Sequence, residues 1–408
     1  MKVILKVTGG PHQGQSFAFG EHDTFVVGRS DSAQFRLPFK DKTLSRVHFL
    51  VEVNPPSCRL MDMASTNGTF VNGKKVSTID LNDGDTIRGG RTHIEVHFEE
   101  DDAPVTRGVE PVADYGIESV TVDDVGPRLP TLPKLTLETE LGRGGMGVVY
   151  RAKNAQGETV AVKTITPAAV ASEGVTARFL REAGILRTLD HPGIVKFREI
   201  GHADSLVYFV MDYVPGKDAD WVVRQDQPLP IARAVGIATQ MLDALSFAHA
   251  KGFVHRDVKP KNLLVSTEGG RDTVKLADFG LARLYLDSPL SGLSFTGQIA
   301  GTYGYMSPEQ ITHFREAKPP ADLYAAAATL YFLLTAKRVY DFPRNVERQL
   351  LMILQDEPVP IRERRPDVPE GLAKVIHRSL KRDPKERFAD AAEMRKALKP
   401  FAAGAAVP

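Results

Sequence analysis

An acid-rich stretch interrupted by prolines divides this chain into two parts of different character. Between Glu99 and Asp124 there are nine acidic residues against one base, Arg107, and two prolines break any long helix or strand. Like charges with few apolar neighbours keep such a segment solvated. At 408 residues the chain also exceeds what one hydrophobic core usually serves. We therefore expect two domains joined by a linker over residues 99–133.

The first part, residues 1–98, alternates short β-like runs with turn sequences. Residues 3–7 and 47–53 are such runs, and Asn67-Gly68 and Asn72-Gly73 are tight-turn dipeptides. This pattern predicts an all-β sandwich.

The second part, residues 134–398, begins with strand-like runs up to about Tyr213 and continues as Ala- and Leu-rich helical sequence. Strands followed by helices are typical of an α+β domain. Residues 402–408 are small and uncharged, and we expect a disordered tail over 399–408.

Composition and the N-terminal sequence restrict the possible partners. The formal net charge of +1 gives no global attraction to nucleic acid or to an acidic membrane. The single cysteine, Cys58, suits a reducing compartment. Lys6 interrupts the first apolar run too soon for a signal peptide, and no stretch approaches about eighteen uncharged apolar residues. We expect a cytoplasmic protein that binds neither nucleic acid nor membranes.

A compact set of chemical groups lies in the helical part. Residues 255–262, His-Arg-Asp-Val-Lys-Pro-Lys-Asn, are followed sixteen residues later by Asp278-Phe279-Gly280. Together they provide a proton acceptor, a charge neutraliser and two metal-binding groups. Phosphoryl transfer needs such a set, because its transition state is highly charged and has to be positioned beside Mg²⁺ and lysines. These candidates are Asp257, Lys259, Asn262 and Asp278.

A glycine-rich loop over residues 141–149 lies between two predicted strands. A helix should follow such a loop in a dinucleotide-binding fold, so the strand-loop-strand context favours a hairpin that closes over a triphosphate. Glycines permit close backbone approach to it. Lys163 then follows in a strand and Glu182 on a helical stretch, and the two can meet across a fold. The loop glycines are Gly142, Gly144 and Gly147.

In the order and spacing of these motifs, residues 134–398 resemble the eukaryotic-like protein kinase family, and the Gly-Gly-Met-Gly loop looks like its bacterial Ser/Thr branch. The resemblance implies a bilobal kinase fold that uses ATP with Mg²⁺ or Mn²⁺. It implies that Lys163 contacts the α and β phosphates and pairs with Glu182. Asn262 and Asp278 would hold two metal ions.

The same resemblance assigns the reacting groups. Asp257 would be the catalytic base and Lys259 would neutralise the γ-phosphate. Lys259 also indicates serine or threonine hydroxyls in protein substrates, rather than tyrosine.

For the adenine site, the resemblance makes Met211 the gatekeeper, while Asp212 and Val214 would offer backbone groups. Apolar residues on either side would enclose the ring, although each of them alone is more often plain core. These residues are Val149, Ala161 and Leu264.

Arg256 precedes the expected base, and an arginine there usually needs an anionic partner, which a phosphothreonine can supply. Thr296 is the first candidate for autophosphorylation and Ser294 the second; the alternative is that both are ordinary loop hydroxyls. Further on, Glu309 is expected to form a buried ion pair with Arg387.

The first domain carries three blocks of its own: Gly28-Arg29-Ser30, then Ser-Arg-Val-His at 45–48, then Ser-Thr-Asn-Gly-Thr at 65–69. Loops gathered at one end of a β-sandwich are where such scaffolds bind. The blocks resemble a forkhead-associated (FHA) domain over residues 1–98, which is a phosphothreonine-reading module.

By this resemblance, Arg29 and Ser45 would grip the phosphate and Arg46 would support it. Thr66 and Asn67 would hold the peptide backbone beside it. We assign Gly28 and His48 to structure.

The two resemblances together predict a Ser/Thr protein kinase whose first domain docks phosphothreonine-containing proteins or another copy of the kinase, as in trans-autophosphorylation by a homodimer. Thr121 and Thr296 are candidate docking sites. Two alternatives stay open. The chain could be a pseudokinase scaffold, although its complete residue set argues against this, or the first domain could be a packing module that holds the kinase inactive without reading phosphate.

Overall fold

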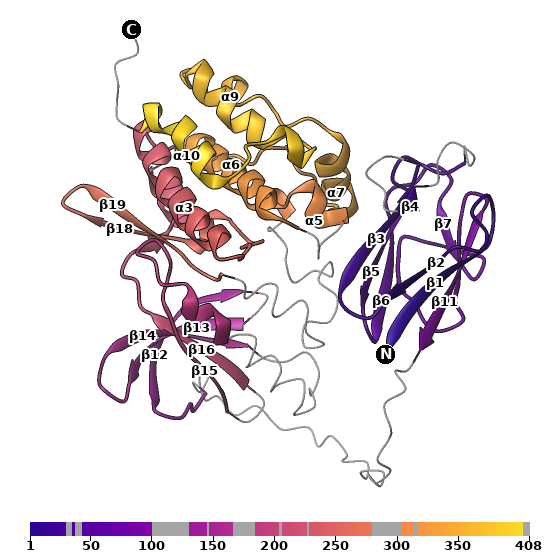
Figure 1. The fold of residues 1–408 in the computed structure, drawn as a ribbon, viewed down its shortest axis with the longest axis horizontal. Coiled ribbons are helices and arrows are strands. Elements are labelled where there is room, and N and C mark those ends of the chain that lie inside the picture. The colour runs from indigo at the N-terminus through magenta and orange to yellow at the C-terminus, as the bar shows by residue number, and fades with distance from the viewer. Residues whose placement is uncertain are drawn as a thin grey trace.

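A computed structural model of the chain describes residues 1–29, 35–36, 43–99, 130–144, 147–165, 184–203, 206–226, 228–279, 303–312 and 317–402. It contains a β-sandwich over residues 1–99, a strand lobe over residues 130–212 and a helical lobe over residues 217–402 (Figure 1). The predicted combination of an all-β sandwich with an α+β bilobal domain is confirmed. Within the described residues, no helix has the length and apolar character needed to cross a membrane.

Two sheets form the sandwich. One has the strand order β2-β1-β11-β10-β7-β8 and the other the order β4-β3-β5-β6-β9. Their strands are β1 (Lys2–Gly9), β2 (Ser16–Phe19), β3 (Asp23–Gly28), β4 (Phe35–Arg36), β5 (Phe49–Asn54), β6 (Ser57–Asp62), β7 (Thr69–Val71), β8 (Lys74–Val76), β9 (Thr78–Asp80), β10 (Thr86–Gly89) and β11 (Thr92–Glu99).

Alternation of side chains builds the sandwich core. Val3 and Leu5 of β1 meet Phe49 and Val51 of β5 in one apolar cluster, and all four are at most 1% exposed. Burying a side chain of this size stabilises a fold by roughly 1.5–3 kcal/mol. Cys58 lies in the same cluster, which is why this thiol is buried.

The strand lobe is a twisted antiparallel sheet of order β12-β13-β14-β16-β15. Leu132, in the segment predicted as linker, is 4% exposed and packs with Val160 and Val210, so ordered packing begins before residue 134. The strands are β12 (Leu135–Gly144), β13 (Gly147–Asn154), β14 (Thr159–Ile165), β15 (Phe197–Ala203) and β16 (Leu206–Asp212), and the short 3-10 helix η1 (Gly184–Thr188) precedes β15.

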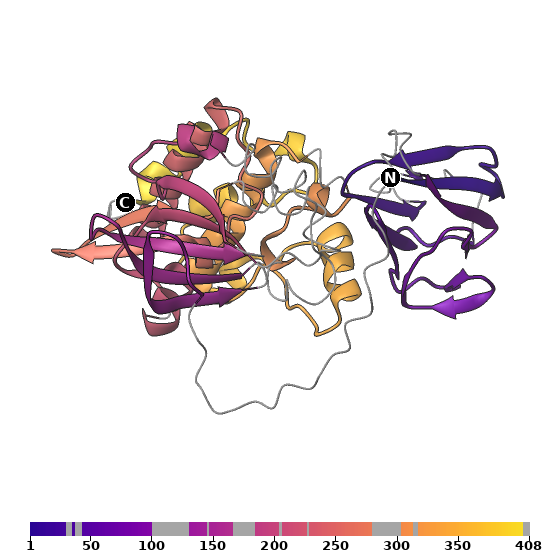
Figure 2. The same cartoon turned by 90° about the horizontal axis from the view of Figure 1, so that it is seen from below.

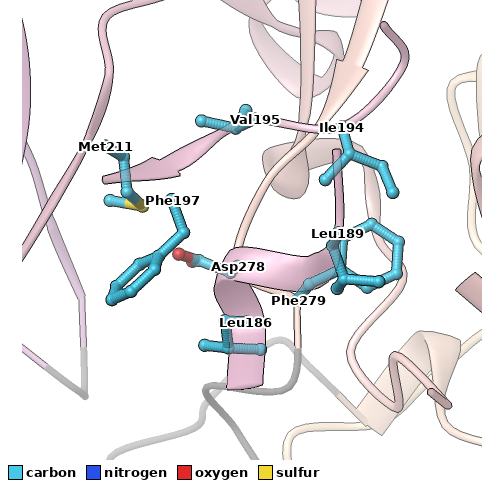
Figure 3. A pocket seen from close by; sticks show the side chains of 8 residues that line it. All are labelled: Leu186, Leu189, Ile194, Val195, Phe197, Met211, Asp278 and Phe279. Atoms are coloured by element: carbon cyan, nitrogen blue, oxygen red, sulfur yellow. The ribbon is translucent and has the colours of Figure 1, made fainter. Parts of the chain in front are cut away.

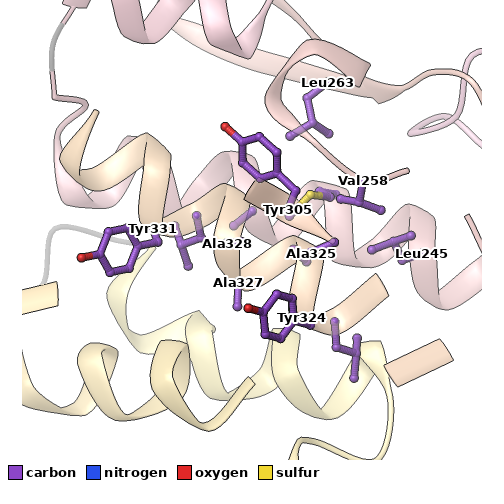
Figure 4. Packing of buried hydrophobic residues seen from close by; sticks show 14 of the residues in the cluster. Leu245, Val258, Leu263, Tyr305, Tyr324, Ala325, Ala327, Ala328 and Tyr331 are labelled. Carbon is purple, nitrogen blue, oxygen red and sulfur yellow. The ribbon is translucent and has the colours of Figure 1, made fainter. Parts of the chain in front are cut away.

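The helical lobe is organised around α6 (Pro319–Thr335), a helix that is apolar on all sides and therefore central. Small residues along it, such as Ala327 and Ala328, let the helix pack closely against its neighbours, while Tyr324 and Tyr331 fill the larger spaces (Figure 4). Other helices are α2 (Ala219–Asp226), α3 (Ile231–Ala250), α5 (Pro308–Thr312), α7 (Val346–Gln355), α8 (Ile361–Arg364), α9 (Glu370–Ser379) and α10 (Ala391–Leu398). A three-stranded sheet, β17 (Lys217–Asp218), β18 (Leu263–Glu268) and β19 (Arg271–Leu276), and the 3-10 helices η2 (Pro260–Asn262), η3 (Tyr303–Tyr305) and η5 (Pro384–Glu386) complete the lobe.

The chain end corrects one prediction. Disorder is expected from residue 399, but Lys399–Phe401 form the 3-10 helix η6. Phe401 packs against the helical-lobe core and closely approaches Gly371 of α9. The aromatic ring has apolar surface to bury, and this outweighs the fraying expected at a terminus.

The sandwich and the helical lobe touch. Strand β3 lies against α5, and both views place this side of the sandwich next to the helices of the lobe (Figures 1 and 2).

Candidate functional site

The loop over residues 255–262 is held from behind by a buried carboxylate. Asp322 of α6 is 1% exposed and accepts the backbone N–H groups of His255 (2.8 Å) and Arg256 (2.7 Å). Arg256 has a φ of 65°, a left-handed conformation that non-glycine residues rarely adopt. The two bonds to Asp322 stabilise that conformation and so fix the direction of Asp257, the next residue.

The carboxylate of Asp257 has two partners at its own loop. Lys259 Nζ lies 2.8 Å from Asp257 Oδ2. Asn262 Nδ2 donates to the carbonyl oxygen of Asp257 (2.7 Å) and to its Oδ2 (3.0 Å). The structure therefore brings the expected base, the expected charge neutraliser and one expected metal ligand together. A carboxylate held in this way can accept a proton from a group that comes within hydrogen-bonding reach of it.

Lys163 and Asp278, which are 115 residues apart in sequence, meet across the two lobes. Lys163 Nζ donates to Asp278 Oδ2 at 2.8 Å. Burial alone would raise the pKa of the Asp278 carboxyl, but the charge and hydrogen bond of Lys163, with Lys259 and His255 behind them, outweigh burial and lower it. Asp278 is thus held as a carboxylate.

The donor set fits a hard divalent cation bound together with phosphate. Asn262 and Asp278 offer amide and carboxylate oxygens, and the bonds above engage Asn262 Nδ2 and one oxygen of Asp278. No cluster of three or more His, Cys, Asp or Glu side chains suited to a metal occurs in the part of the chain that the structure describes. Mg²⁺ is commonly held by one or two protein oxygens with substrate phosphates and water. The two residues match that mode rather than a resident structural metal.

The glycine loop is a β-hairpin, as expected from its strand-loop-strand context. Strands β12 and β13 pair up to Gly144 and Gly147, with Gly142 opposite Val149. Gly147 has a φ of +138°, and a Cβ there would lie 1.8 Å from the carbonyl oxygen of Thr164. Only glycine satisfies both constraints. The hairpin is therefore seated directly beside β14, the strand that carries Lys163, with Val149 of β13 opposite Lys163.

The expected adenine-site residues lie on neighbouring strands. Ala161 on β14 is opposite Met211 on β16, and Met211 is 8% exposed. The backbone N–H of Asp212 donates to the Lys196 carbonyl at 2.9 Å, so it is already engaged. The remaining residues of the predicted set are partly buried rather than core: Val149, Val214 and Leu264.

Behind Met211 lies a pocket that sequence reasoning missed. Its lining is apolar except for one carboxylate (Figure 3). It lies between η1, β15 and the Asp278-Phe279 turn, and the Phe279 ring also packs edge-on against His255 at 4.5 Å. The only sequence signal was an apolar pattern that fits ordinary core equally well. The lining residues are Leu186, Leu189, Ile194, Val195, Phe197, Met211, Asp278 and Phe279.

Helix α5 is bonded to the loop over residues 255–262, which contains the expected catalytic base and is called the catalytic loop below. The N–H and Oγ of Ser307 both lie 3.1 Å from Gln310 Oε1, and Gln310 Nε2 donates to the carbonyl of Arg256 at 2.7 Å. The predicted ion pair between Glu309 and Arg387 is confirmed. The helix is thus bonded both to the loop over residues 255–262 and to Arg387.

In the sandwich, the three sequence blocks come together at one end. Arg29 N–H donates to the carbonyl of Ser45 at 3.1 Å, and Ser45 Oγ accepts the N–H of Thr66 at 3.0 Å. Asn67 Nδ2 donates to the carbonyl of Thr43 at 2.6 Å. Arg29 and Arg46 are both exposed, so two cations and several polar groups lie at the same loops. This arrangement suits a dianion at the surface.

Buried residues brace these loops, as predicted. His48 is fully buried; its Nδ1 accepts the N–H of Ser45 at 3.1 Å and its Nε2 donates to the Gly68 carbonyl at 3.2 Å. A Cβ at Gly28 would lie 2.2 Å from the Arg46 carbonyl oxygen, so glycine permits the close approach of these two blocks. The framework roles of His48 and Gly28 are confirmed.

Two further arginines join this site and were not predicted. Arg88 and Arg91 line a hollow with Thr43, Asn67 and Gly68. The Arg88 guanidinium lies 3.9 Å from the centre of the Phe70 ring. The signal in the sequence was the pair of arginines flanking Gly89-Gly90, a turn between two strands.

Several expected residues lie outside the described part of the chain, and the predictions for them stay predictions. They are Glu182, Ser294, Thr296 and Thr121.

Comparison with known protein families gives two matches. Residues 135–399 match the protein kinase domain and residues 25–90 match the FHA domain. The serine/threonine-protein kinase PkaA of Streptomyces coelicolor is 37% identical over 271 residues, which cover 63% of this chain and 48% of that protein. PknH of Mycobacterium bovis is 37% identical over 261 residues, covering 63% of this chain and 42% of PknH. The chain therefore spans less than half the length of these curated relatives.

Solved structures agree. The kinase domain of Mycobacterium tuberculosis PknI is 28% identical, with a TM-score of 0.52, and the match covers 67% of this chain and 98% of that one. A crystal structure of Rad53 residues 1–466 in complex with AMP-PNP has a TM-score of 0.54 and 22% identity, and the match covers 98% of this chain and 100% of that one. The second likeness concerns the fold.

Proposed function

The chain belongs to the protein kinase family and carries an FHA domain, and we propose that it transfers the γ-phosphate of ATP to serine or threonine hydroxyls of proteins. The observation that carries this proposal is the arrangement around Asp257, whose carboxylate has Lys259 at 2.8 Å and Asn262 at 3.0 Å. A loop with a purely structural role would not need a carboxylate, an amine and an amide to converge where the two lobes meet.

In the proposed reaction, the hydroxyl oxygen of the substrate forms a bond to the γ-phosphorus while the bond from that phosphorus to the leaving ADP oxygen breaks. Asp257 orients the hydroxyl and accepts its proton as this happens. Lys259 neutralises negative charge on the phosphoryl group, and Lys163 holds the remaining phosphates. The hairpin that ends at Gly144 and Gly147 covers them and excludes water.

Family members use ATP with a divalent cation, and we propose Mg²⁺, or Mn²⁺ in its place, held by Asn262 and Asp278. When bound, the cation neutralises phosphate charge and favours the in-line geometry. The lowered pKa of Asp278 supports this role, because a ligand for such an ion has to be ionised.

The FHA domain is proposed to bind phosphothreonine. Arg29 and Ser45 would contact the phosphate, with Arg46 supporting them, and Thr66 and Asn67 would hold the peptide backbone. Arg88 and Arg91 add positive charge beside Asn67, which favours peptides with an acidic residue near the phosphothreonine. Its ligand would be a partner protein or another copy of this kinase phosphorylated in trans, with Thr121 and Thr296 as the candidate docking sites.

Phosphate mapping by mass spectrometry tests the kinase proposal. The full-length chain is incubated with Mg²⁺ and ATP beside two variants, Asp257→Asn and Asp341→Asn. The second is a matched control, since Asp341 is 82% exposed and far from the loop in sequence. Wild type and Asp341→Asn should incorporate phosphate, and Asp257→Asn should lose about 10²–10⁴ in rate. Equal incorporation by all three would exclude Asp257 as the base, whereas no incorporation by any would favour a pseudokinase scaffold.

The FHA proposal has a separate test. Phosphothreonine peptides from the regions of Thr121 and Thr296 are titrated into the full-length chain and into Arg29→Ala. Loss of binding with kinase activity kept supports a phosphopeptide reader. If neither of these self-derived peptides binds wild type, docking of a second copy is excluded and docking of another protein is retained.

A further inference from the structure

The outer face of one sandwich sheet is apolar although it lies outside the sandwich core. Side chains alternate along β5, so Phe49 and Val51 point into the sandwich while Leu50 points away from it. Val26 on β3 and Met61 on β6 are the cross-strand partners of Leu50 and share its direction. Yet all three are at most 4% exposed. With Met63, which is 1% exposed, they form what we call the docking face: Val26, Leu50, Met61 and Met63.

The helical lobe covers this face. The docking face belongs to the same continuous apolar cluster as Tyr303 and Ile311, and β3 lies against α5, the helix that contains Ile311 (Figures 1 and 2). Glu52 lies on the same side of β5 as Leu50 and is 1% exposed. Burial, followed by the charges of Glu52 and Glu347, raises the pKa of the Tyr303 phenol. A carboxylate of the sandwich, Glu52, is therefore close enough to act on a side chain of the helical lobe.

The chemistry of this contact indicates sustained docking. Interfaces between domains of one chain are commonly polar and permit relative motion, unless they are large and hydrophobic. Here four apolar side chains of the sandwich share one continuous buried cluster with residues of the helical lobe, and removing apolar surface from water stabilises such a contact. A face of this kind on a free sandwich would be exposed to solvent.

The covered helix is mechanically connected to the catalytic loop. Gln310 of α5 donates to the carbonyl of Arg256 at 2.7 Å, and Arg256 is followed by Asp257. A domain that rests on α5 therefore lies beside the surface that a protein has to approach when it presents a hydroxyl to Asp257. A bulky substrate meets this obstacle, whereas a short peptide meets much less of it.

We propose that the docking face is an interaction surface for the helical lobe of the same chain, and that the docked sandwich restricts access of protein substrates to the catalytic loop. The second half of this statement rests on the proposed kinase function. The FHA domain then has two working surfaces, because its phosphopeptide loops lie at one end of the sandwich and the docking face lies on its side. The two surfaces are joined in sequence, since Met63 precedes the block that begins at Ser65.

The test compares full-length Leu50→Asp with wild type and with Ile4→Asp. Ile4 is the matched control, because it is a half-buried apolar residue on β1 of the other sheet and belongs to neither large apolar cluster. Hydrogen exchange of residues 303–312 reports docking and needs no activity. It should become faster by about tenfold or more in Leu50→Asp only, and the maximum dimension from small-angle scattering should increase.

Kinetics with two substrates report access. For Leu50→Asp, the KM for dephosphorylated casein should fall by about fivefold or more, the lower end of typical coupling between sites, while the KM for a short serine peptide stays within about twofold. Met61→Lys serves as a second variant if Leu50→Asp does not fold, and protection of the buried Cys58 thiol verifies that the sandwich is intact.

The outcomes separate the two layers. Unchanged exchange and scattering in folded Leu50→Asp and Met61→Lys would overturn the docking surface. Faster exchange with an unchanged KM for casein would overturn the restriction of access and retain the surface. If neither the wild type nor any variant transfers phosphate, the proposed kinase function fails. Hydrogen exchange of residues 303–312 still decides whether the sandwich docks on the helical lobe.

Discussion

Arg387 grips Glu309 with both arms of its guanidinium group: Nη1 lies 2.6 Å from Oε1 and Nη2 lies 2.8 Å from Oε2. The Arg387 side chain is 0% exposed. It also donates to the carbonyl oxygens of Pro320, Lys381 and Arg382. One arginine thus joins α5, α6 and the turn before η5.

Replacing Arg387 by alanine should destabilise the helical lobe by about 3–5 kcal/mol, because it leaves Glu309 as an unpaired, largely buried charge. Chemical denaturation of the full-length chain measures this. Lys374→Ala is the control, since the Lys374–Glu370 pair is exposed on α9 and should contribute nothing measurable. Equal stability of Arg387→Ala and wild type would refute the interpretation of the pair as structural.

Gly147→Ala should destabilise the strand lobe by about 1–3 kcal/mol, because it combines a disfavoured φ with a clash against the Thr164 carbonyl. Gly142→Ala provides the comparison within the same hairpin, since a Cβ there meets nothing within 4 Å. Thermal unfolding should show a lower Tm for the first variant and little change for the second. Identical Tm values would mean that the hairpin adjusts without strain.

Stability should depend on pH through His377. Burial, followed by the charge of Lys381, lowers the pKa of this imidazole, and its Nε2 accepts the N–H of Ile361 at 3.0 Å. The unfolded chain then binds a proton more readily than the folded one, so stability is present above the unfolded pKa near 6.5 and falls as the pH drops through the lower folded value. The free energy of unfolding, measured by denaturation at about pH 7.5 and about pH 5.5, should fall less between these two values in His377→Gln than in wild type.

His191 also has a lowered pKa, because of burial and then the charge of Lys275. The dependence of the unfolding free energy on pH should therefore be reduced in His377→Gln rather than abolished. His97→Gln is the control, since that side chain is 37% exposed. If His377→Gln kept the full pH dependence of the wild type's unfolding free energy, His377 would not be the group that causes it.

Cys58 should be inert in the native protein. Burial, with the charges of Asp80, Glu52 and Asp85, raises the pKa of its thiol to about 12, so almost no thiolate exists at neutral pH. A thiol reagent should therefore modify the chain only as fast as the sandwich opens, and at once in denaturant. Rapid stoichiometric labelling without denaturant would contradict the buried position.

Much of the site could be predicted because phosphoryl-transfer chemistry demands particular groups at particular spacings. The contacts of Lys163 with Asp278 and of Asp257 with Lys259 and Asn262 join residues that the motifs had already singled out. The pair Glu309–Arg387 was predicted from the resemblance to the kinase family, at a position where its role is structural. The sandwich strands were visible because alternation along a strand reports which face is buried.

What the sequence did not reveal depends on contacts between distant segments. The apolar run at the start of β5, residues 49–51, has side chains on both faces buried, but nothing local says that α5 covers one of them. The hollow beside Arg88 and Arg91 and the pocket behind Met211 exist only after several strands have come together. At the C-terminus, composition suggested fraying, but the packing of Phe401 against the helical-lobe core orders residues 399–401.

The double-sided burial of β3 and β5 has a consequence for work with fragments. Residues 1–99 expressed alone would carry Val26, Leu50, Met61 and Met63 as an apolar patch in water, and such patches promote association. A fragment of this kind is expected to self-associate and to need a solubilising fusion partner. Ligand affinities measured with it would combine ligand binding with self-association. In this chain, one face of the phosphopeptide-binding domain is completed by the kinase domain that covers it, so the two domains are best studied together.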